Sequence, residues 1–186
     1  MNCRPKKGVH IESAAVALGA LAGVGCQTAV ATEIDETGSY QGLSVVEVVG
    51  ANGEKYLYGD AINSPLLESP DSVWSLVSGT AVSLGATVPD IEDLLRHVAD
   101  TVGTDQFGVP RYAEGTWSES PRSFRPPWGK FGLAFRESAP RIEQWYQVSG
   151  VTLQKLLGMV DGRFDLEPLV RISMESAIAM AKLEQN

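Results

Sequence analysis

The stretch from Val9 to Ala31, VHIESAAVALGALAGVGCQTAVA, decides the fold. Alanine, the strongest helix former, dominates it, so we expect a helix over these residues. Gly19 and Gly23 stand one helical turn apart and would let another backbone approach closely. Because this helix is apolar on every side, most of its surface must be covered. The stretch therefore predicts either the central helix of the domain or a helix shared with a second subunit.

An export signal is the alternative interpretation of the same stretch. Basic residues precede an uncharged run from Ser13 to Thr32, and Ala29-Val30-Ala31 has the small-x-small form of a signal-peptidase site. Glu12 lies at the edge of that run, and alanine and glycine stand where an export signal prefers leucine. We therefore expect a buried helix in a cytoplasmic protein, with export as the alternative if residues 1–31 are a signal peptide.

The composition of the chain excludes some classes of function. The chain has 186 residues, 15 Lys and Arg against 23 Asp and Glu, and a net charge of −8, and its 44% of hydrophobic residues can fill a core. One globular domain over residues 1–186 is expected at this length. Such an acidic chain is not expected to bind nucleic acid through bulk charge. Cys3 and Cys26 form no disulfide framework. We expect no cofactor and no membrane partner.

A β-hairpin is predicted between residues 43 and 59. Two runs rich in Val and Tyr flank Asn52-Gly53, the strongest short hairpin signal. If Asn52 and Gly53 are the two central turn residues, the opposed pairs are Val49 with Tyr56, Val48 with Leu57 and Glu47 with Tyr58. This register places Val46, Val48 and Leu57 on one face, which we expect to be the core side, with Tyr56 and Tyr58 on the other.

Two amphipathic helices should follow the hairpin. Ser69-Pro70-Asp71 predicts a helix start with a capping serine, and the apolar stripe from Val73 to Leu84 predicts that helix, ended by Gly85. Thr87 to Asp90 resembles a capping box before a second stripe that ends at Gly103. The short link between them predicts antiparallel packing of the two helices.

The C-terminal part of the chain should add further helices. Ser138 and Pro140 can start one that runs through Tyr146, with a short one near Leu153 to Val160, and Asp165 is expected to cap the last. We thus predict an α+β fold, mostly helical, in which the hairpin at 43–59 forms a small antiparallel sheet.

The segment from Thr104 to Pro140 is the most distinctive feature. Prolines and glycines break any long period, while aromatic residues recur every few positions and residues 111–141 hold six basic and three acidic side chains. Residues 111–141 therefore carry +3 and the rest of the chain −11. Arginine beside tryptophan can stack on planar groups or hold a carboxylate or phosphate. The candidate ligand-binding residues are Arg111, Arg122, Arg125, Trp117 and Trp128. The alternative is that these side chains pin a long loop onto an acidic core.

A second candidate site lies on the helix before Gly103. Asp90, Asp93, His97 and Asp100 are spaced by 3, 4 and 3 residues and so share one helical stripe. Carboxylate and imidazole groups can bind a metal, and Asp93 can orient His97 as a general base. A metal would need ligands from a second element as well, such as Asp60, Glu68 or Glu143. A solvated helix face is the ordinary interpretation of this pattern.

Two functions follow from these features. The first is a non-catalytic binding or assembly module, in which the Arg and aromatic segment binds an anionic ligand or a protein partner. A homodimer would then form through the Gly19/Gly23 helix or an exposed sheet edge. The alternative is a hydrolase centred on His97 and Asp93, with or without a metal.

Overall fold

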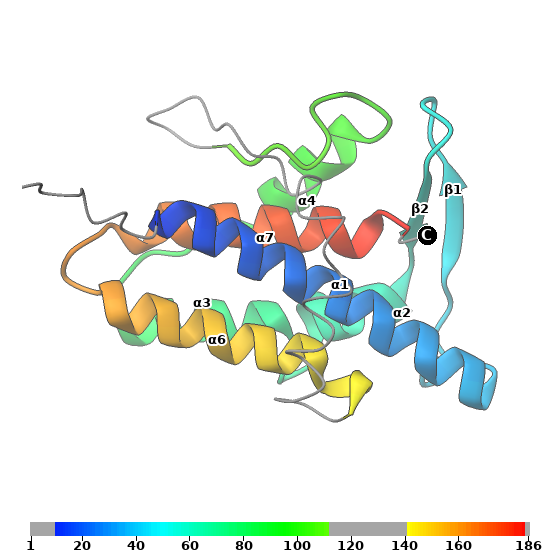
Figure 1. Cartoon of the computed structure of the whole chain (residues 1–186), viewed down its shortest axis with the longest axis horizontal. Helices are drawn as coiled ribbons and strands as arrows, with labels where there is room; N and C mark the ends of the chain where they lie inside the picture. Colours follow the sequence, from blue (N-terminus) through cyan, green and yellow to red (C-terminus); the bar gives the residue numbers. More distant parts are fainter. Residues whose placement is uncertain (1–9, 112–140, 185–186) are drawn as a thin grey trace, which may run out of the picture.

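A long central helix organises the protein. The computed structural model describes residues 10–111 and 141–184, and its first element is α1, Ile11–Thr37, which ends on Gly38 in the left-handed conformation. α1 packs most extensively against the last helix, α7 (Leu166–Lys182), and then against α6 (Trp145–Val160) (Figure 1). The prediction of a central helix is therefore confirmed.

The glycines of α1 are the points of closest approach between helices. A Cβ atom built on Gly19 would lie 2.1 Å from the carbonyl oxygen of Ser173 in α7, and one built on Gly23 would lie 2.1 Å from that of Ala177. On the other side of the helix, a Cβ on Gly25 would lie 2.7 Å from the backbone nitrogen of Tyr146 in α6. These glycines therefore pack within the chain, so the Gly19/Gly23 surface that we considered for a homodimer is already used by α7.

By length and composition alone, α1 could cross a membrane. Its most apolar window of 18 residues has a mean hydropathy of 1.7, yet 67% of that window is buried inside the fold. A core helix and a signal sequence both pass this test, so the cellular location stays a prediction. Cys26 in the middle of α1 is fully buried, as a small core residue would be, and burial raises the pKa of its thiol.

The hairpin forms as predicted but in a different register. β1 (Val46–Val49) pairs antiparallel with β2 (Lys55–Tyr58), and Val48 lies opposite Tyr56, not opposite Leu57. The cause is the turn. The backbone nitrogen of Gly50 donates to the carbonyl oxygen of Glu54, so the loop holds the three residues 51–53. Within the loop only Gly53 has a positive φ, 78°, whereas the two-residue loop that Asn-Gly favours needs a positive φ at both positions.

The predicted core side of the hairpin is wrong as well. Tyr56 is fully buried and meets the ring of Phe107 edge-on, with ring centroids 4.9 Å apart, whereas every residue of β1 is exposed. The Tyr56 hydroxyl also accepts a hydrogen bond from the backbone of Gly103. In this register Val46 and Val48 share a face with the two tyrosines, but it is β2, through Tyr56 and Tyr58, that packs against the helices, and the valines of β1 stay exposed.

The far edge of β2 meets the C-terminal end of the chain. Tyr56 forms an isolated bridge with Leu183, and the backbone nitrogen of Glu184 donates to the carbonyl oxygen of Lys55 at 3.0 Å. The side chain of Gln27 in α1 donates to the carbonyl oxygens of Ala181 and Leu183 at 3.1 and 3.0 Å. This end of α7 is thus fixed to both the hairpin and α1.

Two short helices, α2 (Asp60–Asn63) and the π-helix η1 (Ser64–Glu68), lead into α3, Val73–Ser83. The cap of α3 is Ser72, whose hydroxyl accepts from the backbone of Ser75, so the prediction of Ser69 as the cap is wrong. Gly85 follows its end with a φ of 79°.

α4 spans Ile91–Thr101 and is capped by Asp90, not by Thr87. α3 packs mainly against α6 and α4 packs against α7, so the two helices do not form the antiparallel pair that their short link predicted. In Figure 1 they lie on opposite sides of α7.

The final helices form from capped, amphipathic segments. A short 3-10 turn, η3 (Ile142–Gln144), leads directly into α6, which is one continuous helix rather than the two that we expected. Asp165 caps α7 as predicted, by accepting from the backbone of Glu167. The fold is a mostly helical α+β single domain, with a two-stranded antiparallel sheet in the described part of the chain.

Candidate functional site

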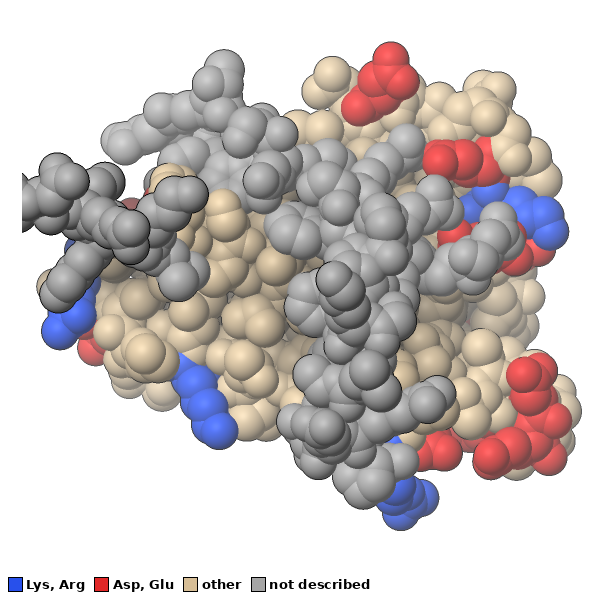
Figure 2. Space-filling view, in the orientation of Figure 1, with Lys and Arg blue, Asp and Glu red and all other residues tan. Residues whose placement is uncertain are grey.

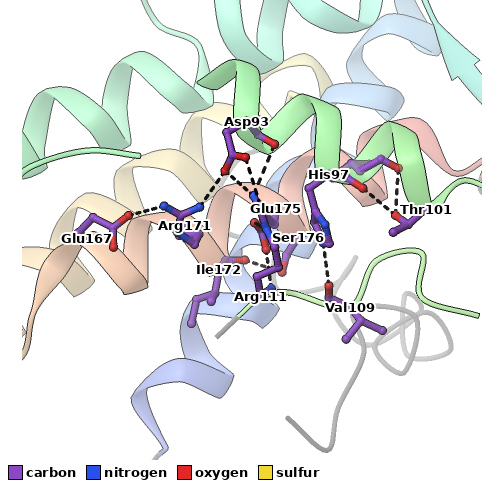
Figure 3. Close-up of polar contacts among 11 residues, drawn as sticks. Asp93, His97, Thr101, Val109, Arg111, Glu167, Arg171, Ile172, Glu175 and Ser176 are labelled. Carbon is purple, nitrogen blue, oxygen red and sulfur yellow. Dashed lines mark hydrogen bonds and ion pairs between the residues drawn. The ribbon is translucent and has the colours of Figure 1, made fainter. Parts of the chain in front are cut away.

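A cluster of charged side chains joins α4, α7 and the start of the Arg and aromatic segment (Figure 3). α7 contributes Glu167, Arg171 and Glu175, which are spaced by four residues and so lie on one helical stripe. α4 packs across that stripe and contributes Asp93. Arg111 reaches in from the loop that follows α4. We call these five residues the ion cluster.

Arg111 holds a buried carboxylate in two ways. Its backbone nitrogen donates to Glu175 Oε2 and its side-chain Nε donates to Oε1, each at 2.7 Å. The Glu175 side chain is only 2% exposed. A buried charge is costly unless it is both paired and hydrogen-bonded, and these two contacts meet both conditions. Arg111 is therefore the residue that makes a carboxylate tolerable at this position of α7.

Asp93 links the two arginines of the cluster. One of its carboxylate oxygens accepts from Arg111 Nη2 at 2.7 Å and from Arg171 Nη1 at 3.1 Å, and the other accepts from Arg111 Nη1 at 3.2 Å. The Arg111 guanidinium is the main reason why the pKa of Asp93 lies below its usual range. Arg171 also donates to Glu167 at 2.8 Å. The cluster is a continuous chain of alternating charges in which each guanidinium contacts two carboxylates.

The hydrolase alternative receives no support from this geometry. His97 Nε2 lies 3.3 Å from the carbonyl oxygen of Val109, while the Asp93 carboxylate is bonded to arginines. Asp90 accepts from the backbone of Glu92 as the cap of α4. His97 and Asp93 therefore position the loop after α4, each through a different contact.

The metal alternative receives no support either. Over residues 10–111 and 141–184, no three His, Cys, Asp or Glu side chains gather closely enough to bind a metal ion. The stripe residues Asp90, Asp93, His97 and Asp100 stay on α4 without the second-element ligands considered above, which were Asp60, Glu68 and Glu143.

Only part of the predicted ligand-binding set falls within the described structure. Arg111 lies in the ion cluster, and its partners are acidic side chains, as the alternative of a segment pinned to an acidic core expected. The other four predicted residues lie outside the described residues: Arg122, Arg125, Trp117 and Trp128. Sequence reasoning missed Glu175 and Arg171. Their signal was the alternation of charge at positions 167, 171 and 175 of a helix whose other positions are largely apolar.

A second unusual charge lies at the other end of α7. The Lys182 side chain is buried, with the residue only 5% exposed. Its Nζ donates to Asn63 Oδ1 at 3.0 Å and lies 4.8 Å from the centroid of the Tyr58 ring. Burial lowers the pKa of Lys182 to about 8, although the nearby Glu68 opposes this effect. The ammonium group is thus held by an amide and an aromatic ring, which compensate only part of its lost hydration.

We expect Lys182→Met to stabilise the protein at pH 7. The gap between a pKa of 10.5 in the unfolded chain and about 8 in the folded one corresponds to about 3 kcal/mol. As pH rises through 8, the folded state loses its proton before the unfolded state does, so wild-type stability rises and the advantage of the variant shrinks. Urea unfolding of both proteins at pH 7 and pH 9.5 measures this. An unchanged difference between the two pH values would contradict it.

Comparison with protein-family models, with curated proteins and with solved structures finds no match to this chain.

Proposed function

We propose that the protein is a non-catalytic binding module whose Arg and aromatic segment receives an anionic ligand or an acidic protein partner. The observation that carries this proposal is the anchoring of Arg111. Backbone and guanidinium together fix the start of the segment onto a buried carboxylate of α7. An anchor of this kind is what a binding loop needs, because loops bind best when a rigid scaffold positions them.

The charge balance supports an anionic ligand. Once Arg111 is paired with the core, the segment still holds basic residues in excess of its own acids, since Arg122, Arg125, Lys130, Arg136 and Arg141 stand against three glutamates. Arg141 is described and is strongly exposed, with Glu143 at 3.9 Å. Exposed pairs at such distances contribute little. The Arg141 guanidinium is therefore available to a ligand.

One end of the molecule disfavours anions. In Figure 2 the acidic side chains gather at the lower right, where Figure 1 places the end of α1. α1 has no basic residue in its last turn, and Glu33, Asp35 and Glu36 lie near this end. Acidic groups at a helix C-terminus add to the negative end of the helix dipole. An anion approaching the protein is thus repelled from this end.

Intrinsic tryptophan fluorescence provides the test, since Trp117 and Trp128 of the segment are two of its four sources. Titration with polyglutamate, and separately with inorganic pyrophosphate, should change the emission and distinguish an acidic polymer from a small anion. Arg122→Ala/Arg125→Ala should weaken binding by roughly 10- to 100-fold, because two charge-assisted contacts are lost. Added salt should weaken binding too.

The control is Arg96→Ala, which removes an exposed arginine of α4 and should leave binding unchanged. No response to either anion, or equal weakening by the control and the double variant, would overturn the proposal.

A further inference from the structure

β1 forms the outer edge of the sheet. Figure 1 shows β1 at the outside of the molecule, with β2 between it and the helices. The opposite edge of β2 is covered by Leu183 and Glu184. β1 therefore has a neighbour on one side only among the described residues.

The hydrogen-bond phase of the hairpin determines which backbone groups of β1 point outward. The backbone nitrogen of Gly50 donates to the carbonyl oxygen of Glu54 in the partner strand. Along an antiparallel pair, every second residue forms backbone hydrogen bonds to the partner strand. The next residues of β1 that bond β2 are therefore Val48 and Val46. The backbone groups of Glu47 and Val49 then point away from β2. Over the described residues, no backbone hydrogen bond reaches them.

The side chains of this edge are unusually apolar. Val46, Val48 and Val49 are 51%, 42% and 61% exposed. In natural proteins, a lysine, a proline or a β-bulge usually prevents an edge strand from pairing with another chain. β1 has none of these. Its one charge, Glu47, is paired with Lys55 of β2 at 3.1 Å. Little therefore prevents another strand from pairing here.

We propose that β1 pairs antiparallel with β1 of a second copy of this chain, with Val48 opposite Val48 on the two-fold axis. In this register Glu47 of one copy lies opposite Val49 of the other. The outward-pointing backbone N–H and C=O groups of these two residues then form hydrogen bonds with each other across the interface. The neighbouring register that centres on Glu47 would place two glutamates directly opposite each other, which is unfavourable.

A second copy fits this edge for reasons of symmetry and composition. A two-fold interface uses the same patch on both subunits, so the patch must be self-complementary. Around Val48 the pairing sets Val46 against Gly50 and Val45 against Ala51, which are small or apolar throughout. Joining the two hairpins also converts two marginal two-stranded sheets into one four-stranded sheet. This inference does not rest on the proposed anionic ligand.

Disulfide trapping tests the register directly. Residues opposite each other in a non-hydrogen-bonded pair have Cα atoms about 4.5 Å apart, within the range of a disulfide. In a Cys3→Ser background, where the remaining Cys26 is fully buried, Val48→Cys should give a covalent dimer of twice 19.9 kDa on mild oxidation. Glu47→Cys should cross-link about tenfold less, because its symmetry mate lies about 7–8 Å away diagonally. Val82→Cys, an exposed valine on α3, gives the background level.

Proline provides an independent test in the full chain. Val49 does not donate to β2, so Val49→Pro should keep the hairpin and circular dichroism spectrum but shift sedimentation from dimer to monomer. Val49→Thr keeps the outward N–H and should remain dimeric. Both variants should bind polyglutamate as wild type does, which separates this inference from the ligand proposal. A monomeric wild type, or equal cross-linking of Val48→Cys and Val82→Cys, would overturn it.

Discussion

Gly23→Ala should destabilise the protein by about 3 kcal/mol or more, at or above the upper end of what overpacking usually costs. The added methyl group would lie 2.1 Å from the carbonyl oxygen of Ala177 and 2.7 Å from the backbone nitrogen of Ala181. Both are backbone atoms of α7, so no side chain can rotate to make room. The helices would have to move apart, and the tight packing around them would be lost. Gly23→Val should fail to give a cooperatively folded protein.

Gly158→Ala is the matched control. Gly158 lies inside α6, and a Cβ built there meets nothing within 4 Å. Alanine is the better helix former by about 1 kcal/mol, so this variant should be slightly more stable than wild type. Thermal unfolding followed by circular dichroism compares the three proteins. Equal melting temperatures for Gly23→Ala and Gly158→Ala would show that α1 and α7 do not meet through Gly23.

Arg111→Ala should cost about 3–5 kcal/mol, the usual cost of removing one partner of a buried ion pair. The variant leaves Glu175, 2% exposed, with only the backbone nitrogen of residue 111 as its partner in this contact. Arg111→Lys should recover little, because a lysine cannot bond Asp93 and Glu175 through separate, fixed nitrogens. Arg96→Ala removes an exposed arginine and should change stability by less than about 0.5 kcal/mol.

Two further measurements make the ion-cluster prediction specific. In the double variant Arg111→Ala/Glu175→Gln, the buried charge is gone, so part of the lost stability should return. The pKa of Asp93 lies below its ordinary value of 3.8 in the folded state. Its contribution to stability is therefore present above about pH 4 and is lost as pH falls through the lowered pKa. The gap between wild type and Arg111→Ala should narrow at low pH in urea unfolding, and a constant gap would contradict this role.

Helices that follow a simple pattern were predictable from the sequence, but their caps were not. The stripe from Ile91 to Val102 identified α4, because its apolar positions have one strict helical spacing. Its cap was placed at Thr87 when Asp90 performs that role. In the same way, the pattern predicts Ser69 as the cap of α3, and the structure has Ser72 there. Several polar residues near a helix start can each cap it, and the one that does is selected by the packing of the preceding chain.

The hairpin shows how one residue of turn length changes an entire surface. Asn52-Gly53 was identified correctly as the turn, but Ala51 also belongs to the loop. This change of register reverses which side chains share a face with Tyr56. Valine and tyrosine are both favoured in strands, so propensity alone does not say which one meets the helices. Tyr56 faces inward because it packs against Phe107, which comes from a distant segment of the chain.

Of the main contact in the ion cluster, only the arginine could be predicted from the sequence. Arg111 stood out because a basic, aromatic segment begins near it in an acidic chain. Its partner Glu175 lies 64 residues further along, and such a pairing depends on how α4 crosses α7. Local sequence patterns carry no information about that crossing.

The pairing of α1 with α7 joins the two ends of the chain, and this has a consequence for biosynthesis. Gln27 and the carbonyl group that it binds at Ala181 are 154 residues apart. At usual elongation rates of 5–20 residues per second, α1 emerges from the ribosome roughly 8–30 s before its partner is made. During that interval the glycine face of this long apolar helix lacks the helix that covers it. A truncated chain without the last turns of α7 would leave that face of α1 uncovered permanently.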